Sequence, residues 1–446
     1  MKLPFLKKAW FLVSVPMGLF LILFLVLFFR DIEPVEPPEH LAYSHPKIYL
    51  EDNFFVDFEQ SLANLDSFYR EFRSLSYSNE DESEAEKEVR AFEFVEKTES
   101  APPEGLIELR KAILAKKAFL SFQVKSFDDA LPHLGKMRSY IQYERKVMRY
   151  YASKNEWAKV SKANFRLQQF LIKYVQSNSY IEGLVYVACE NIYKSGLNAI
   201  LDDYEVPRSF LEENLKYMNE LHDWRELYRS ALVEELEVTR RSIVKICNAK
   251  MTFGSHRPSS EEWIYRMMRP NIFYKDSLPI FDFWYKAVDR PLNKLGKDPL
   301  TVLQAKRSDL YYVFTHREVL LQLMMLPALD SGTNKFRLLQ TRRDLLKLRI
   351  ASFLLRQDTG QVPRDFGDLV PKYLASVPDD CFNGAKLLYI PEKELFYSVG
   401  SNLLDEFGKY DPERPHSHYT DDIVRLIGKF PELEKEKPKK NKFHQY

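Results

Sequence analysis

Apolar residues recur with a helical spacing through the middle of the chain. Between residues 102 and 249 they return every three or four positions, as in Leu106, Leu109 and Ile113, which places them on one face of a helix. Further predicted inward-facing sets are Trp157, Val160, Leu167, Leu171 and Tyr174; Ile181, Leu184, Ala188 and Ile192; and Leu211, Leu215, Met218 and Leu221. The spacing predicts helices of roughly 15–25 residues joined by short loops, stacked as an antiparallel bundle or as a solenoid of helical hairpins. We call residues 48–335 the helical body.

An uncharged segment near the N-terminus predicts a membrane anchor. Residues 9–29 carry no charge, follow Lys2, Lys7 and Lys8, and end at Arg30. At about 1.5 Å per residue such a helix crosses the hydrocarbon layer of roughly 30 Å. Lysines on the short side predict a cytoplasmic N-terminus. We therefore expect a single-pass anchor, residues 1–30, in the inner membrane of a bacterium, with residues 9–29 in contact with lipid and the bulk of the chain extracytoplasmic. The alternative is a cleaved signal peptide, whose apolar core is about 7–15 residues.

Two segments are predicted to connect or extend the folded parts. Residues 31–47 contain four prolines, which predict an extended spacer that lifts the following domain off the bilayer. Residues 431–446 carry a mixed and then basic run of charges, which predicts a solvated, disordered tail.

Glycine is scarce and unevenly placed. The chain has 14 glycines in 446 residues, against roughly 31 expected from an average usage of about 7 %. Six of them fall in the last 87 residues, so the C-terminal part is richer in turns than the helical body. The shortage argues against glycine-rich nucleotide-binding folds. The balance of 65 Lys and Arg against 64 Asp and Glu creates no net field that would favour nucleic acid as a partner.

Acidic clusters on the predicted helices favour structural pairing over catalysis. Glu234, Glu235 and Glu237 could be imagined as paired catalytic carboxylates, but Glu237 and Arg241 are spaced i,i+4 and are expected to pair on the helix surface. The sequence contains no HExxH, GxSxG or Walker A motif, so we assign no catalytic residue. A small-ligand sensor would need an apolar pocket near the methionines at 267–268 and 324–325.

Cysteine and histidine carry no strong metal signal. Cys189, Cys247 and Cys381 lack CxxC spacing, which argues against zinc and thioredoxin-like redox sites. Cys189 and Cys247 lie in helical patterns and are expected to be small buried apolar residues. His416 and His418 flank one serine in an acidic segment, where we favour a solvated loop over a weak metal site.

The most specific pattern lies between residues 336 and 430. A helix with Leu346 and Ile350 facing inward runs to Gln357 and ends before Gly360 and Pro363, which stop helices. Its arginines are expected to face outward, namely Arg342, Arg343, Arg349 and Arg356. Strands are predicted at 386–390, 395–399 and 423–427. The fold class is therefore mainly α, with a small C-terminal α+β lobe that holds a three-stranded antiparallel sheet.

This order of turns and strands resembles the C-terminal domain of type II secretion major pseudopilins. The matching positions are Gly360, Pro363, Leu369, Pro371, Pro378, Asp380, Phe382, Gly384, Leu388, Tyr389, Phe396, Tyr397, Ser398, Gly400, Asp421, Asp422 and Ile423. The resemblance covers about 90 of the 446 residues. The whole chain also looks like a group of large membrane-anchored bacterial proteins that end in such a lobe.

The resemblance implies a calcium site. In pseudopilins the loop between the last strands binds calcium, and hard carboxylate oxygens suit that ion. The ligands implied here are Asp405, Asp411, Asp421 and Asp422.

Taken together, these features favour a protein that works by contact. We expect a membrane-anchored extracytoplasmic scaffold or accessory protein of an envelope or secretion-type assembly, with protein partners in the envelope. The alternative is an envelope hydrolase that acts on a cell-wall or polysaccharide substrate, which would need a deep cleft with two convergent carboxylates about 5–10 Å apart.

Overall fold

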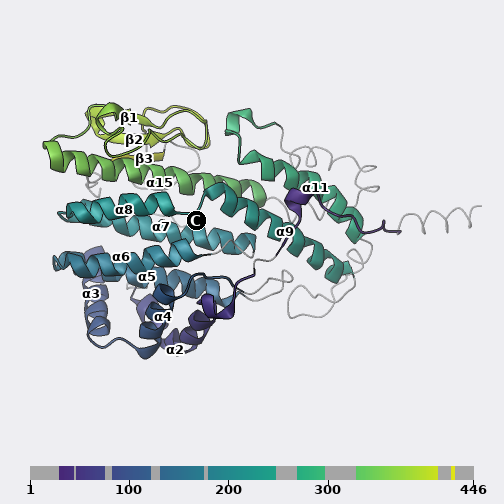
Figure 1. Cartoon of the computed structure of the whole chain (residues 1–446), viewed down its shortest axis with the longest axis horizontal. Coiled ribbons are helices and arrows are strands. Elements are labelled where there is room, and N and C mark those ends of the chain that lie inside the picture. Colours follow the sequence, from purple (N-terminus) through teal and green to yellow (C-terminus); the bar gives the residue numbers. More distant parts are fainter. Residues whose placement is uncertain are drawn as a thin grey trace, which may run out of the picture.

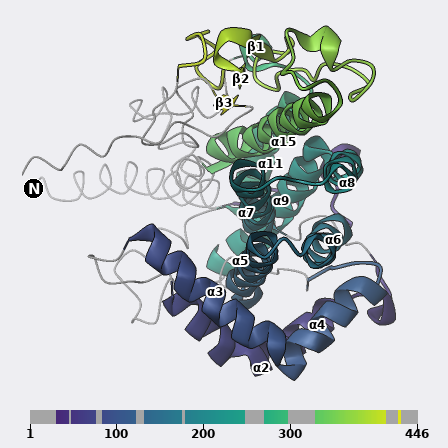
Figure 2. The ribbon, with the colours of Figure 1, turned by 90° about the vertical axis from the view of Figure 1, so that its left-hand side faces the viewer.

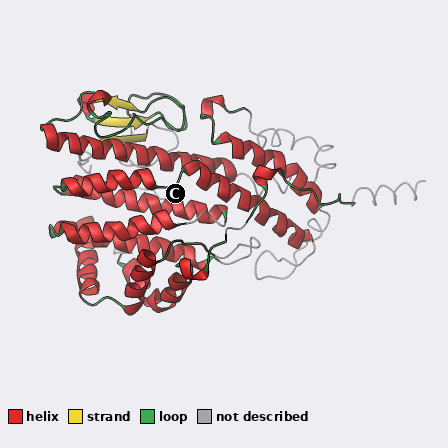
Figure 3. Ribbon diagram, viewed as in Figure 1, coloured by secondary structure: helices red, strands yellow, loops and turns green. Residues whose placement is uncertain are grey.

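The computed structural model describes residues 30–44, 47–75, 83–121, 131–174, 179–247, 269–296, 328–409 and 423–426. This part of the chain is mainly helical with one small antiparallel sheet near the C-terminus (Figures 1 and 3), as the sequence predicted. The helices are α2 (Phe55–Ser74), α3 (Glu84–Ser100), α4 (Glu104–Ala115), α5 (Pro132–Ser153), α6 (Trp157–Lys173), α7 (Tyr180–Asp203), α8 (Arg208–Glu220), α9 (Trp224–Cys247), α11 (Pro270–Ala287) and α15 (Ala328–Thr359). The strands are β1 (Leu388–Ile390), β2 (Leu395–Ser398) and β3 (Ile423–Leu426).

The helices are stacked in layers. α2, α3 and α4 lie at one end, α5 and α6 come next, and α7, α8 and α9 follow (Figures 1 and 2). The long helix α15 packs on α7, α8 and α9, and the sheet covers its opposite side. α15 therefore lies between the helical stack and the C-terminal sheet.

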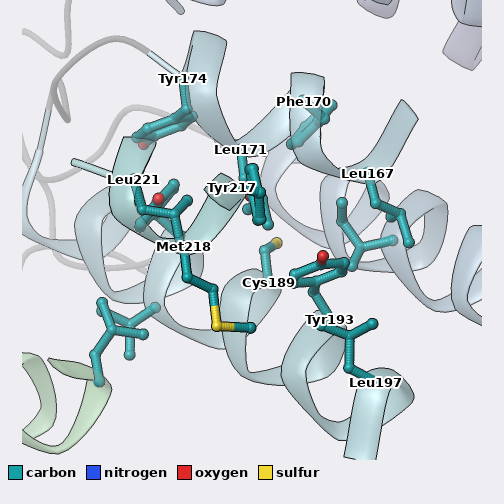
Figure 4. Packing of buried hydrophobic residues seen from close by; sticks show 14 of the residues in the cluster. Leu167, Phe170, Leu171, Tyr174, Cys189, Tyr193, Leu197, Tyr217, Met218 and Leu221 are labelled. Carbon is teal, nitrogen blue, oxygen red and sulfur yellow. The ribbon is translucent and has the colours of Figure 1, made fainter. Parts of the chain in front are cut away.

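Rings and aliphatic side chains fill the middle of the stack. Figure 4 shows side chains of α6, α7 and α8 interlocking, among them Leu171, Tyr193 and Met218. Leu171 and Tyr193 are fully buried and Met218 is nearly so. The burial of Cys189 in the same layer confirms the prediction for that residue and raises the pKa of its thiol to about 12. The Cys247 side chain lies outside the described part of the chain.

The predicted inward faces are confirmed for some helices and wrong in part for α7. Leu106, Leu109 and Ile113 on α4 are fully buried. On α7, however, Ile181 was expected to face inward and is 56 % exposed. α7 packs against α5, α6, α9 and α15, so most of its circumference is buried and a single-face pattern does not describe it.

The outward direction predicted for the arginines of α15 is wrong for two of them. Arg343 and Arg349 are 2 % and 1 % exposed, whereas Arg356 is exposed as expected. α15 is covered on opposite sides by the helices and by the sheet. The buried guanidinium groups are tolerated because each binds a carboxylate, Glu190 and Asp202 respectively, since a buried charge needs a partner.

The C-terminal elements form a cap on α15, which we define as residues 360–409 and 423–426. β1 pairs with β2 in the register Tyr389↔Phe396, and β2 pairs with β3, both antiparallel. The strands lie within two residues of the predicted ones. Arg337 of α15 ties the cap to the stack, because it donates to the Ala287 carbonyl at 2.7 Å and also to the Cys381 carbonyl of the cap. The predicted boundary between residues 335 and 336 falls inside α15.

The segment that follows the predicted anchor lies against α11. The Asp31 carboxylate accepts hydrogen bonds from the backbone N–H groups of Asn271 and Ile272 at 3.0 and 3.2 Å, at the start of that helix. His40 pairs with Asp282 at 2.7 Å. The anchor itself, residues 9–29, lies outside the described residues. Of the helices that are described, none has both the length and the apolar character needed to span a membrane.

Candidate functional site

A buried ion cluster lies at the junction of α7 and α15. The Arg343 guanidinium binds Glu190 through hydrogen bonds of 2.8 and 3.1 Å, and the Lys194 ammonium is 3.2 Å from the same carboxylate. Burial alone would raise the pKa of Glu190, but the two cations outweigh it and lower the pKa to about 2. Burial lowers the pKa of Lys194 to about 8. The cluster has internal partners for its charges and holds α15 on α7.

A cleft of about 540 Å³ opens beside this cluster. α15, the junction of α8 and α9, and the cap segment from Tyr373 to Cys381 form its walls. Lys347 and Asp344 of α15 line it, and their side chains pair at 3.6 Å. Burial raises the pKa of Asp344 and lowers that of Lys347. The cleft is the place where a hydrolase of the predicted kind would hold its substrate.

Each carboxylate that lines the described part of the cleft is already engaged. Asp344 accepts a hydrogen bond from Gln340 at 2.8 Å in addition to its contact with Lys347. Asp223 accepts from the Arg225 backbone N–H at 2.8 Å, and Asp379 pairs with Lys386 at 2.7 Å. These acids therefore have cationic or amide partners, as structural carboxylates do.

The acidic residues of α9 divide into paired and buried groups. Glu237 accepts hydrogen bonds from Arg240 at 2.6 Å and from Arg241 at 2.9 Å, which confirms the expected pairing. Glu234 is fully buried. Burial raises the pKa of Glu234 to about 8, although the Tyr43 hydroxyl opposes the shift, and it raises that of Glu235 to about 7. The Glu234 side chain is therefore mostly protonated and uncharged at pH 7.

A loop of the cap, residues 402–409, which we call the apolar loop, exposes apolar side chains. Its Leu404 and Phe407 are 63 % and 71 % exposed. Leu403 and Phe407 have φ angles of 60° and 58°, in the left-handed region that side chains other than glycine rarely adopt. Gly408, at φ 68°, permits a close approach to β2, because a Cβ there would lie 2.4 Å from Leu395 Cδ2.

Local hydrogen bonds hold the apolar loop in this conformation. The Asn402 side-chain oxygen accepts from the Leu404 backbone N–H at 3.1 Å, and Asp405 accepts from that of Phe407 at 2.9 Å. The Lys393 ammonium donates to the Phe407 carbonyl at 3.0 Å. The sequence predicted a calcium ligand, Asp405, in this loop but not its exposed apolar side chains, although three apolar residues between the turn formers Asn402, Asp405 and Gly408 were a readable signal.

The structure describes only part of the predicted calcium site. Asp405 is exposed, and its Oδ1 also accepts from the Tyr397 hydroxyl at 3.1 Å. Asp411, Asp421 and Asp422 lie outside the described residues, as do His416 and His418. Among the residues whose side chains can be placed, no group of three or more His, Cys, Asp or Glu could hold a metal ion. The calcium site stays a prediction.

Comparisons with known proteins find no relative of this chain. No family model, no curated protein and no solved structure matches the chain. The similarity of the C-terminal lobe to the major pseudopilins therefore rests on the sequence pattern alone and stays a prediction.

Proposed function

We propose that this chain is a membrane-anchored, extracytoplasmic scaffold or accessory protein of an envelope or secretion-type assembly, and that it acts by binding another protein. The observation that carries the proposal is the apolar loop. Phe407 and Leu404 are mostly exposed, yet hydrogen bonds and a left-handed backbone fix the loop. Non-glycine residues in this region cost on the order of 1–3 kcal/mol each, and such strain is found most often at functional sites.

The way the cap is attached supports the same function. The Leu292 backbone N–H donates to the Phe382 carbonyl at 2.7 Å, and Lys372 binds Asp358 at the end of α15 at 2.7 Å. Arg208 of α8 binds the other oxygen of Asp358 at 2.5 Å. These ties fix the cap to the helical stack, so an apolar surface on the cap is presented by a rigid support. Preorganised surfaces bind with a smaller loss of conformational entropy.

A pull-down from the natural host tests the proposal. The tagged full chain, purified in a mild detergent, is expected to enrich at least one envelope protein, and the double variant Leu404→Asp/Phe407→Asp is expected to lose it. Ile181→Asp is the matched control, since Ile181 is 56 % exposed on α7. Equal enrichment of the same envelope proteins by the double variant and the control would overturn the role given to the loop.

The alternative function, an envelope hydrolase, would use the cleft. Asp344 would be its proton donor, because burial raises the pKa of this side chain. Its contacts with Lys347 and Gln340 would have to open during the reaction. Turnover of a cell-wall or polysaccharide substrate by the purified full chain, abolished by Asp344→Asn, would favour this alternative over the contact function.

Calcium binding remains part of the proposal. Asp405 together with Asp411, Asp421 and Asp422 would supply carboxylate oxygens to the ion. Millimolar calcium is then expected to raise the melting temperature of the full chain, and Asp405→Asn is expected to reduce that shift. An unchanged melting temperature would remove the site.

A further inference from the structure

A groove on the surface of α7 is lined by more positive than negative side chains. It has a volume of about 400 Å³, within the range of small-molecule sites, which is roughly 300–1,000 Å³. α5, α7 and α15 contribute its walls. The described residues that matter for its chemistry are Arg145, Asn191, Lys194, Ser195, Asp202 and Arg342. We call it the arginine groove.

The Arg145 side chain lies close against α7 at Gly196. A Cβ on Gly196 would lie 2.6 Å from Arg145 Cγ, so any larger residue would displace the arginine stem. Glycine inside a helix costs about 1 kcal/mol of stability relative to alanine. At position 196 the missing side chain leaves the space that the aliphatic part of Arg145 occupies. The Arg145 Nη1 lies 3.4 Å from the Ser195 hydroxyl oxygen. The guanidinium is thus held in the groove by packing, with one long polar contact.

Two polar atoms of the groove residues are buried and have no hydrogen-bond partner within the described part of the chain. They are Arg145 Nε and Asn191 Oδ1. More than about 90 % of buried polar groups are hydrogen-bonded in native structures, whereas Arg145 Nε has no partner among the described residues, so few internal hydrogen bonds compete with a ligand for Arg145. The terminal Nη atoms of Arg145 and the Ser195 hydroxyl lie on the exposed side and can donate to oxygen atoms in the groove.

Among the described residues, Arg145 has no carboxylate within ion-pair distance. The one carboxylate among the described lining residues of the groove, Asp202, is bound by Arg349. Lys194 is bound by Glu190, and the nearby Arg342 and Arg343 oppose its positive charge. Burial and then the charge of Arg149 lower the pKa of Arg145, whereas Glu88, which binds Arg149 at 2.9 Å, opposes this shift. An anion in the groove would relieve this repulsion.

We propose that the arginine groove binds a small anion that bears a phosphate or a carboxylate group, with Arg145 as its main ligand. The planar guanidinium suits both groups because it offers parallel N–H donors. Arg342 and Ser195 lie beside it in the groove and would complete the contact. The volume of about 400 Å³ favours a small molecule over a polymer segment. The inference is independent of the contact function of the apolar loop.

Calorimetric titration of the full chain in a mild detergent tests the site. The probes are inorganic phosphate and citrate, each at a constant ionic strength set with sodium chloride. Saturable binding of phosphate identifies a phosphate ligand, and saturable binding of citrate alone identifies a carboxylate ligand. Failure of both probes to bind the natural chain would overturn the proposal.

Variants assign the binding to Arg145. Arg145→Met keeps an unbranched stem over Gly196 and removes the charge, so affinity is expected to fall about tenfold or more, as for the loss of a charge-assisted hydrogen bond. Arg145→Lys is expected to retain part of the affinity. Arg70→Met is the matched control, because the Arg70 side chain is 76 % exposed on α2. If Arg145→Met does not fold, Arg342→Gln, with an expected loss of about tenfold, replaces it. Affinity equal to that of the control in the folded Arg145→Met or Arg342→Gln variant would contradict the assignment.

Discussion

Two regions of the molecule depart from the rule that charged side chains lie on the surface and apolar ones inside. They are the junction of α7 and α15 and the apolar loop of the cap. At the junction a guanidinium, Arg343, is 2 % exposed, whereas on the loop an aromatic ring, Phe407, is 71 % exposed. Arg343 has its partner inside the molecule, the Glu190 carboxylate at 2.8 Å. Phe407 is held by its backbone, and its ring is left to solvent. We infer that the first arrangement serves the stability of the chain and the second serves a partner outside it.

The largest effect is expected from breaking the buried pair. Arg343→Met removes the main partner of Glu190 and leaves a carboxylate that is fully buried. Loss of one partner from a buried pair costs about 3–5 kcal/mol of the free energy of unfolding, and the lower end of this range is expected here because the Lys194 ammonium stays 3.2 Å from Glu190. Urea unfolding of the full chain, followed by circular dichroism, measures it. The matched control is Arg356→Met on the exposed part of the same helix, with an expected change within about 0.5 kcal/mol. Equal losses in both variants would remove the difference between the junction and the surface.

Acid is expected to weaken the same junction. The pKa of Glu190 is about 2 in the folded chain against an ordinary value of 4.5, so the unfolded chain binds more protons between these values. Its contribution to stability is complete above pH 4.5 and is lost as the pH falls toward 2, by an amount on the order of 2–3 kcal/mol. Unfolding free energies at pH 5 and pH 3 measure it. A pH dependence in Glu190→Gln as steep as in the natural chain would contradict the assignment.

At Glu234 we expect a smaller effect on stability, with the opposite dependence on pH. Its pKa is raised to about 8 from an ordinary 4.5, so the folded chain holds a proton that the unfolded chain releases, and stability is lost as the pH rises from 4.5 to 8. Glu234→Gln removes this cost and is expected to stabilise the chain by about 1–2 kcal/mol at pH 7. The gain should grow between pH 5 and pH 8 in thermal unfolding. A gain that does not change with pH would show that the carboxyl group does not titrate in this range.

The smallest effect on stability is expected at the apolar loop. Phe407→Asp removes a ring that is 71 % exposed, so the free energy of unfolding is expected to change by no more than about 0.5 kcal/mol. Thermal unfolding of the full chain measures this. A loss similar to that of Arg343→Met would mean that the ring supports the fold, which would remove the contrast with the junction.

The sequence predicted the helices and strands better than it predicted which of their faces other elements cover. Local spacing was sufficient for α4 and for the strands, because residues such as Leu106 and Phe396 follow the period of one element. It failed for Arg343, whose partner Glu190 lies 153 positions away. A pattern along one helix cannot reveal that a second layer will cover its polar side.

The candidate site was less predictable for the same physical reason. The exposure of Leu404 and Phe407 depends on how the loop folds back on β2 at Gly408. The arginine groove depends on the crossing of α5 and α7 at Gly196. Both are properties of packing between elements. Of the predicted calcium ligands, only Asp405 lies in the part of the chain that the structure describes.

Site-specific photocrosslinking in living cells tests most directly whether the apolar loop binds a protein. p-Benzoylphenylalanine is placed at position 407 and, as a control, at position 181 on α7, where Ile181 is 56 % exposed. We predict that position 407 gives a discrete adduct with an envelope protein, identified by mass spectrometry, that Leu404→Asp removes and position 181 does not give. Absence of an adduct at position 407, or the same adducts from both positions, would contradict a contact function for this loop.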